Sequence, residues 1–452
     1  MRSELAALLC VLLWAGAAGA QEELDEILGG FEDDPGFEAK EEDPHDDAAR
    51  WWDLSGSYEL SGTLNLRSHR SAAEGDSGRR TGYRGLQRLR NRLNLQLDLE
   101  PWADWKLRAE GWGFWDAAYL LKGRSDYTRE VRNAYEFDAE LGEAWLQGTL
   151  PGDVDLKLGR QVVIWGRSET LRVLDVINPL DNREPGRVDL EDLRRPTGML
   201  RLDAFLAEWT LTGLVIPEIR FDANPVRGSD FFPSAVELRE RQPSGFRDLE
   251  LAAALTGTFS GWDISFHAAR FWSDTPRLAR SGVGLVHDRL WMVGAGGNLT
   301  AGSWLFKAEL AWLSGLGFFA TRDEKARGDA LLGVEYYGWN ETTVVVEILN
   351  RHLFDHERAM SRSPDFAAED RQEIAFRVTR NLWNDTLHLT LLGVLLGWNA
   401  EDGSILRVDL AYDIRDALSA GVGLLLYQTG ELPPLDRWGR NDRLFFNLKW
   451  SF

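Results

Sequence analysis

The chain has 452 residues, a formal net charge of −21 and a mean hydropathy of −0.31, and it contains 20 Trp, 44 Gly and one Cys. After residue 20, no apolar run approaches the roughly 20 residues that a membrane-spanning helix requires, which excludes a helical membrane protein. A single cysteine, Cys10, excludes a disulfide framework. We also expect no nucleic-acid partner.

Residues 1–20 have the features of a secretory signal peptide. They combine a short positive region at Arg2, an apolar run over residues 5–15 and a small-residue cleavage site at residues 18–20. Because Cys10 lies in the segment to be removed, we expect a mature chain without cysteine. Such a chain is stabilised by backbone pairing and burial rather than by cross-links.

Residues 21–50 form an acidic segment, in which 13 acidic residues stand against Lys40 and Arg50. This composition favours a disordered periplasmic leader. Within it, a helical turn would place four apolar side chains on one side. They are Leu24, Ile27, Leu28 and Phe31. Two interpretations stay open: a solvated spacer, or a short motif that binds a periplasmic or inner-membrane transporter partner.

From Trp52 onward the sequence period changes to two. Between Leu54 and Leu66, leucine, glycine and tyrosine at even positions alternate with polar residues at odd positions. The following segment, residues 88–100, sets leucines against charged and amide side chains in the same way. Segments of this length exceed ordinary globular strands and suit tilted membrane crossings. A low mean hydropathy is compatible with this interpretation, because lipid-facing and lumen-facing residues cancel.

Alternation of the same kind predicts further strands along the rest of the chain. They lie near residues 104–117, 137–150, 153–165, 197–205, 207–217, 247–259, 262–273, 288–300, 302–314, 329–338, 341–351, 371–380, 385–397, 403–412, 418–428 and 442–452. The total is 18, an even number, as required when both termini lie on one side. Because the pattern is weakest over residues 197–217 and 397–428, 16 strands remain an alternative.

The connections between these strands alternate in length. Tight turns are predicted at residues 101–103, 151–152, 260–261, 301–302, 338–340 and 381–384. Long polar loops are predicted at residues 68–85, 118–136, 166–196, 218–246, 274–287, 315–328, 352–370 and 429–441. Short turns on one side and long loops on the other are typical of outer-membrane β-barrels.

Tryptophans gather at the short-turn ends and at the termini. The indole ring, with one N–H, favours the membrane–water interface. We therefore predict a periplasmic aromatic girdle in contact with outer-membrane lipid, which a soluble β-sandwich would not explain. Its members are Trp52, Trp102, Trp105, Trp262, Trp304, Trp339, Trp383 and Trp450.

The last nine residues are apolar on one strand face and polar on the other, with Phe445 as the exception. This ending resembles the C-terminal signal of bacterial outer-membrane barrels, and it implies that Trp450 and Phe452 present the last strand to the barrel-assembly machinery. The combined pattern predicts an all-β fold over residues 51–452. We expect a closed antiparallel transmembrane β-barrel, with short periplasmic turns and long extracellular loops, in the outer membrane of a Gram-negative-type cell.

Arg88, Arg90 and Arg92 share the face opposite the leucines of their strand. If the leucines face lipid, these arginines line the lumen and create a positive field that favours carboxylates or phosphates. In the alternative interpretation they pair across the lumen with acidic residues. The candidate partners are Glu110, Asp116, Glu140 and Glu143. The two interpretations can hold together, since buried charges need partners.

Residues 166–196 form the most distinctive predicted loop, with mixed charges and three prolines. These features favour an ordered loop. A loop that folded back into the lumen would be a constriction, because irregular backbone is allowed at membrane depth where protein or water surrounds it. A plain surface loop is the alternative. The candidate constriction residues here are Arg160, Arg167, Asn178 and Asp181.

Two stretches have a familiar form: Gly-Arg-Gln-Val-Val-x-Trp-Gly at residues 159–166, and Val-Ile-Asn-Pro at residues 176–179 followed by Asp181. With residues 224–233, they resemble a domain-of-unknown-function family of proteobacterial outer-membrane barrels. The resemblance implies association with transporters of the resistance-nodulation-division superfamily that handle hydrophobic or lipid-like molecules. Residues 159–167 are more loosely similar to alginate-export barrels. Since the family more often has an acidic residue at Arg167, no loop chemistry carries over.

Signals for metal binding or catalysis are weak, and we expect no cofactor, no metal and no enzyme activity. His352 and His356 are four residues apart in a predicted loop, a spacing that can bind a metal on a helix, but we expect the two side chains simply to be solvated at the surface. We therefore predict a channel or export partner for a solute or a hydrophobic molecule, narrowed by residues 166–196. The alternative is a non-conducting scaffold that docks a periplasmic transport complex through the acidic leader.

Overall fold

The computed structural model describes residues 51–188, 190–243 and 248–452. The predicted signal peptide and acidic leader, with Leu24, Ile27, Leu28 and Phe31, lie outside the described residues. Within the described ones, no helix is both long and apolar enough to cross a membrane.

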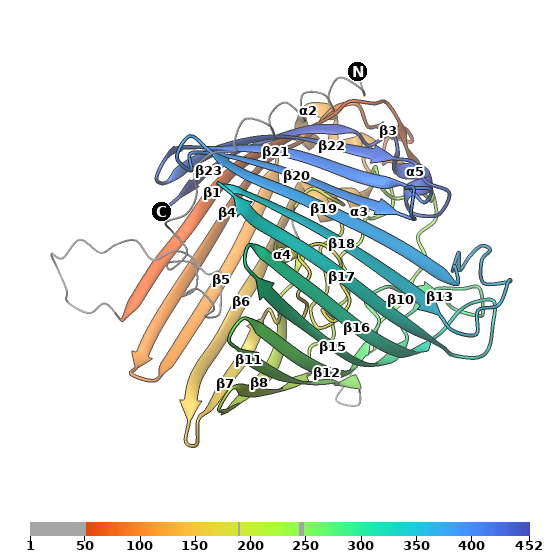
Figure 1. Ribbon diagram of the computed structural model, residues 1–452. Helices are drawn as coiled ribbons and strands as arrows, with labels where there is room; N and C mark the ends of the chain where they lie inside the picture. The colour runs from red at the N-terminus through yellow and green to blue at the C-terminus, as the bar shows by residue number, and fades with distance from the viewer. Residues whose placement is uncertain (1–50, 189, 244–247) are drawn as a thin grey trace.

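Eighteen long strands form one sheet that closes into a barrel (Figure 1). They are β1 (Trp52–Asn65), β4 (Gly85–Trp102), β5 (Trp105–Asp116), β6 (Phe137–Leu150), β7 (Val154–Gln161), β8 (Thr197–Leu206), β9 (Trp209–Ile216), β11 (Glu250–Phe259), β12 (Trp262–Trp272), β15 (Arg289–Ala301), β16 (Trp304–Leu316), β17 (Lys325–Trp339), β18 (Thr342–Leu353), β19 (Asp370–Leu382), β20 (Leu387–Leu396), β21 (Ser404–Arg415), β22 (Leu418–Gln428) and β23 (Arg443–Ser451).

Each strand pairs antiparallel with its neighbours in chain order, and β1 pairs with β23 to close the ring. The closing register runs from Ser57 opposite Ser451 to Asn65 opposite Arg443. At the C-terminus, the Phe452 N–H donates to the carbonyl of Gly56 at 2.9 Å. The predicted fold class is confirmed with 18 strands, so the alternative of 16 is wrong.

The predicted alternation of short and long connections is confirmed. All predicted tight turns are present, and β8–β9 and β21–β22 are joined by two further turns at residues 207–208 and 416–417. The long loops contain short elements: β2 (Arg70–Glu74), β3 (Arg80–Gly82), β10 (Glu240–Arg241), β13 (Arg277–Leu278), β14 (Leu285–Val286), α2 (Ala118–Lys122), η2 (Arg124–Asp126), α3 (Arg129–Val131), η3 (Arg132–Glu136), α4 (Leu190–Leu193) and α5 (Leu435–Trp438).

The two faces of the strands differ as the alternation predicts. On β1, Leu54 and Tyr58 are exposed on the outside of the barrel, whereas Ser57, Ser61 and Thr63 are buried inside it. Of the girdle tryptophans, all but Trp105 are exposed at the short-turn rim. The ring of Trp105 covers Gly148, where a Cβ would lie 2.4 Å from it, so glycine is needed there. Membrane contact of the girdle and the assembly role of Trp450 and Phe452 stay predictions.

One strand ends earlier than predicted. The segment expected over residues 153–165 is a strand only to Gln161, after which the chain turns into the barrel. Glu143 on β6 accepts the N–H of Val162 at 2.8 Å, and Asn178 accepts the N–H of Val163 at 2.8 Å. These side chains replace the sheet partners that the strand would have had.

Candidate pore constriction

The described residues of the segment 162–196, which we call the inserted loop, lie inside the barrel (Figure 1). Val163, Trp165, Leu171, Leu174 and Ile177 are buried in one hydrophobic cluster. The cluster continues onto inward-facing residues of the wall: Met199, Leu214, Ile216, Ala252, Ala254, Ala269, Phe271, Leu290, Met292, Ala311, Leu313, Leu331, Leu349 and Ala375. The loop is therefore part of the protein interior, and the predicted surface-loop alternative is wrong.

Small residues on the wall make room for the loop. A Cβ at Gly294 would lie 2.4 Å from the Leu174 side chain, and one at Gly296 would lie 2.8 Å from it. Real Cβ atoms do not approach a methyl group so closely, so both positions require glycine for Leu174 to pack against β15. The Leu174 side chain of the loop thus packs into a depression of the wall.

Two buried carboxylates of the wall hold the loop backbone. Glu309 on β16 accepts the N–H of Arg167, the N–H of Ser168 at 3.0 Å and the N–H of Leu174 at 3.2 Å. Glu347 on β18 accepts the Ser168 hydroxyl at 2.6 Å and the Glu169 N–H at 3.3 Å. Both glutamates are 0 % exposed. A buried carboxylate is stable only with such donors, so loop and wall satisfy each other.

Ion pairs add to this anchorage. Glu169 of the loop bridges Lys307 at 3.2 Å and Arg377 at 3.3 Å. Arg167 pairs with Asp263 on β12 at 2.8 Å. Of the predicted constriction residues, Arg167 is therefore a tether to the wall rather than a side chain that faces the passage.

Asn178 organises the loop from within. Its amide oxygen accepts the Val163 N–H, and its amide nitrogen donates to the carbonyls of Gln161 at 3.2 Å and Arg195 at 3.0 Å. Arg172 donates to the Asn178 carbonyl at 2.8 Å. Asn178 is fully buried, so it joins the start and the end of the loop rather than contacting the lumen.

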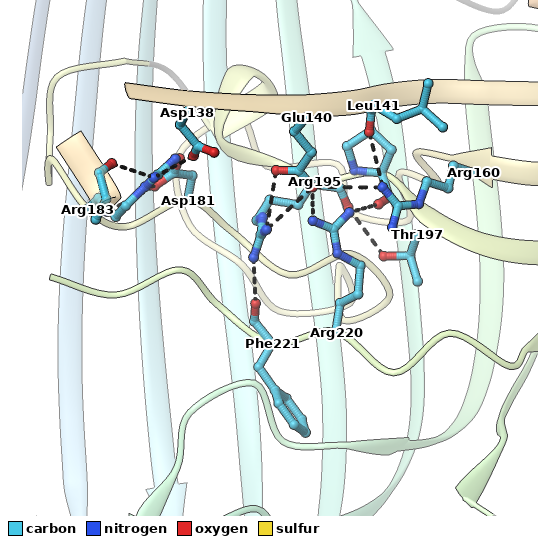
Figure 2. A network of polar contacts seen from close by, with 12 residues as sticks. Asp138, Glu140, Leu141, Arg160, Asp181, Arg183, Arg195, Thr197, Arg220 and Phe221 are labelled. Atoms are coloured by element: carbon cyan, nitrogen blue, oxygen red, sulfur yellow. Dashed lines mark hydrogen bonds and ion pairs between the residues drawn. The ribbon is translucent and has the colours of Figure 1, made fainter. Parts of the chain in front are cut away.

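On the opposite side, the loop meets β6 through charged groups (Figure 2). Arg183 bridges Asp181 of the loop and Asp138 of β6, at 2.6 Å and 3.0 Å. Both carboxylates are 32 % exposed. Asp181 therefore lies, as predicted, at a charged face of the loop, but already paired with its neighbour.

Glu140 on β6 lies beside three guanidinium groups, those of Arg160, Arg195 and Arg220 (Figure 2). Arg160 lies 3.9 Å from Glu140 and donates from Nε to Glu218 at 3.1 Å. Three guanidinium groups thus surround one carboxylate of the wall, and this part of the lumen is lined by charged side chains.

Arg88 and Arg90 of β4 are inside the barrel and paired with carboxylates, but of the four candidate partners Asp116 is the one that they contact, and their other partner, Glu184, was not predicted. Arg88 and Arg90 contact Glu184 of the inserted loop at 2.5 Å and 3.6 Å, and Arg90 lies 3.6 Å from Asp116. Burial would raise the pKa of the Glu184 carboxyl, but Arg88, Arg90 and Arg187 lower the pKa to about 2. Glu184 is thus a carboxylate throughout the physiological pH range.

Arg92 has different surroundings. It donates to Asn94 at 2.8 Å, and its guanidinium carbon lies 4.6 Å from the centre of the Trp112 ring. The three arginines of this strand face therefore differ in their partners, and they do not form a continuous row of unpaired positive charges. Two are neutralised by the loop, and the third is held against an aromatic ring.

Sequence reasoning missed the residues that anchor the loop. Lys307, Glu309 and Glu347 are charged positions on inward strand faces, which alternation alone identifies as polar lumen residues. Their partners at residues 167–174 are separated from them by more than a hundred positions, and no local pattern joins the two. Gly294 and Gly296 stand in a glycine-rich strand, which is the one sequence signal that a backbone or side chain approaches closely there.

The two histidines of the predicted pair contact different groups. His352 lies 2.9 Å from Asp370, and His356 lies 3.0 Å from the carbonyl of Ala367. His352 belongs to the end of β18 rather than to the loop.

Comparisons with known proteins agree with this architecture. OccAB1 of Acinetobacter baumannii is 9% identical, with a TM-score of 0.53, 89% of this chain and 96% of that chain covered. OccAB3 of the same organism is 11% identical, with a TM-score of 0.51 and coverages of 88% and 99%. The outer membrane protein OpdK of Pseudomonas aeruginosa is 12% identical, with a TM-score of 0.50 and coverages of 88% and 99%. At these identities the likeness shows the fold.

No curated protein matches the chain. A family model, described as protein of unknown function DUF1302, matches residues 1–452. The predicted resemblance to a domain-of-unknown-function family is confirmed, while the transporter association and the alginate-export similarity stay predictions. This chain belongs to the DUF1302 family of proteins of unknown function.

Proposed function

We propose that this protein is an outer-membrane channel of a Gram-negative-type bacterium, reached after removal of the signal peptide, and that the inserted loop narrows its lumen. One observation carries the proposal: the loop contacts Glu309 and Glu347 on one wall and Arg88 and Asp138 on the other. A loop fixed at both ends across a lumen limits what passes. The porin-like fold of the similar structures supports this function.

The mechanism is passive and electrostatic. A solute passing the loop meets paired charges rather than a single-sign ring, among them Arg160, Arg195 and Arg220 around Glu140. Because each of these charges already has a partner, a passing solute meets no isolated ion that must be desolvated. Selection then depends mainly on the width left beside the loop.

Planar-bilayer recording tests the channel. Replacing both anchors, Glu309→Gln with Glu347→Gln, weakens the acceptors of the loop N–H groups, and we expect a larger and noisier single-channel current. The matched control is Asp98→Asn, which removes a lumen carboxylate that pairs with Arg108 at 2.8 Å and does not touch the loop. A wild-type barrel without current, and a double variant that also passes none, would contradict the proposal.

A hydrophobic or lipid-like cargo and a periplasmic partner are the finer form of this proposal. The family resemblance supports a transporter partner, and the apolar residues of the leader are its proposed contact. Replacing Leu28 and Phe31 with Ser is expected to abolish capture of an inner-membrane transporter complex while the barrel still assembles. If the wild-type barrel is sealed and captures such a complex, the protein is the scaffold instead.

A further inference from the structure

The part of β6 nearest the long loops has a neighbouring strand on one side only. On the β5 side, β6 is paired from Phe137 to Gly148, whereas on the β7 side its pairing begins at Ala144. The chain leaves the wall there, because β7 ends at Gln161 and β8 begins at Thr197. Residues 137–143, which we call the open edge, therefore have no strand beside them on the β7 side in the described part of the chain.

The open edge lies at membrane depth. On β5, Trp105 stands at the short-turn rim, and Trp115, which is 43 % exposed, follows ten residues later. A strand rises about 3.3 Å per residue and tilts by about 40°, so ten residues span about 25 Å of depth, the height of the apolar band of such barrels. Trp115 is the partner of Phe137, and Gly111 is the partner of Leu141. The open edge therefore runs through the half of the band nearest the long loops.

Hydrocarbon does not tolerate an open strand edge. Backbone N–H and C=O groups at this depth need a protein partner or water. The Leu141 carbonyl is bonded by the side chain of Arg160 at 3.1 Å rather than by a strand. By the two-residue period, the edge groups of Phe137 and Ala139 point the same way as those of Leu141, and no described strand reaches them.

Charged side chains at the same level also indicate water. In the sheet register Arg160 stands opposite Ala144 and Gly198, on the strand face on which Leu158 is 52 % exposed. A charge on the lipid face of a barrel is costly at membrane depth. Arg160 and its partner Glu218 are nevertheless 28 % and 29 % exposed. Such a pair is compatible with this position if water surrounds it.

The polar groups continue from this outward position into the lumen (Figure 2). The Arg160 guanidinium group lies 3.9 Å from Glu140, which alternates on β6 with the outward-facing Leu141. Glu140 in turn pairs with Arg195 at 3.4 Å and with Arg220. Arg195 precedes β8 and Arg220 follows β9, so irregular chain occupies the place of a continued wall. A polar path therefore crosses the wall.

We propose that the barrel opens sideways at the open edge, and that an amphiphile with one hydrocarbon chain passes there between the lumen and the leaflet on the long-loop side. The inference rests on the proposed channel function, for which it names a route and a substrate class. The hydrocarbon chain would lie in lipid beside Phe137 and Leu141, while the head group passes Arg160 and Glu140. Because these charges have partners of their own, the path admits a polar head group without selecting the sign of its charge.

Cysteine accessibility tests the opening. The only cysteine, Cys10, lies in the predicted signal peptide, so single cysteines can be placed in the full mature protein. Leu141→Cys lies at the open edge. Its matched control is Leu95→Cys, on the same outward face two strands away in the register and 40 % exposed. In lipid nanodiscs, a charged methanethiosulfonate should label Leu141→Cys about tenfold faster, because a charged reagent does not enter hydrocarbon.

Two outcomes of this experiment would overturn the opening. Equal labelling rates would mean that lipid covers the edge as it covers the closed wall. A disulfide-linked dimer of Leu141→Cys would assign the edge to a contact between two copies of the chain.

The substrate class is tested with dodecanol that carries a diazirine beside its hydroxyl group, since photolysed alkyl diazirines react well with carboxylates. After irradiation in nanodiscs, mass spectrometry should find the label at Glu140 and not at Asp98, a lumen carboxylate behind the continuous wall of β4 and β5. The matched butanol should label neither, because it lacks a chain that holds it in lipid. Equal labelling of the two carboxylates would mean entry through the barrel mouth, and no label at Glu140 would exclude passage at the edge.

Neither test measures current, so the two proposals fail separately. A sealed barrel in which Leu141→Cys reacts fast and Glu140 is labelled refutes the channel alone. A conducting barrel in which the two cysteines react alike refutes the sideways opening alone.

Discussion

The two sides of the inserted loop differ in how they contact the barrel. Toward β15–β18 the contact is a core, in which Leu174, Glu309 and Glu347 are 0 % exposed. Toward β6 and β7 the contact is ionic, and Asp181 and Arg160 are 32 % and 28 % exposed. The first side fixes the loop, and the second leaves charged groups in reach of water. The passage is therefore expected on the β6–β7 side.

The largest effect is expected where the core contact is broken. Gly294→Leu would place side-chain atoms inside the volume of Leu174, and overpacking of this kind costs about 3 kcal/mol. The loop should leave the β15 wall, with several-fold higher conductance and new proteolytic cleavage near Arg172. The matched control is Gly213→Leu on β9, because a Cβ at Gly213 meets nothing within 4 Å. Unchanged conductance in Gly294→Leu would place the passage away from the loop.

A smaller effect is expected at the ionic contact with β4. Glu184→Gln removes the carboxylate that Arg88, Arg90 and Arg187 share, and should destabilise the barrel by about 2 kcal/mol. The same change adds net positive charge, so the reversal potential in a salt gradient should move toward anion selectivity. Urea unfolding in vesicles and bilayer recording measure the two effects. Loss of stability without a selectivity shift would mean that Glu184 lies away from the ion path.

The acid dependence of stability separates Glu184 from other carboxylates. Its pKa of about 2 in the folded protein lies below the value of about 4.3 for an unfolded Glu. A depressed pKa contributes stability that is present above the unfolded value and is lost as the pH falls toward 2. The wild type should therefore lose more stability than Glu184→Gln between pH 5 and pH 2. Parallel losses in the two proteins would contradict the role of the three arginines.

The barrel was predictable because its signals are local. Alternation with period two, tight turns and the tryptophans at one end are read within a few residues of each strand, and they located all 18 strands. The exception is instructive: β7 ends at Gln161 because Glu143 and Asn178 take the next two N–H groups. A distant side chain overrides a local pattern there.

The site was predictable only in part, since it depends on pairing across the lumen. The inserted loop and Arg88, Arg90 and Asp181 were identified as candidates, but the sequence does not reveal that Glu184 is the partner of both arginines. Arg167 and Asn178 were placed in the right loop with the wrong role. The Asn178 amide oxygen accepts the Val163 N–H, and the Arg167 guanidinium group pairs with the Asp263 carboxylate of the wall. Both side chains therefore hold the loop in place.

The smallest effect is expected at Arg160, on the exposed side of the loop. The side chains of Arg160 and Glu218 are 28 % and 29 % exposed, so water partly screens their ion pair, and Arg160→Gln should cost about 1 kcal/mol of stability. It removes one of three cations beside Glu140 and leaves Glu218 without its Nε donor. A narrow lumen concentrates the field of each charge, so the reversal potential should move toward cation selectivity.

The matched control is Arg67→Gln, an ion-pair arginine at the long-loop rim that contacts Asp442 at 2.7 Å and is 52 % exposed. Salt screens a rim charge, so only the Arg160 variant should shift, and equal shifts in both variants would place the ion path away from β7.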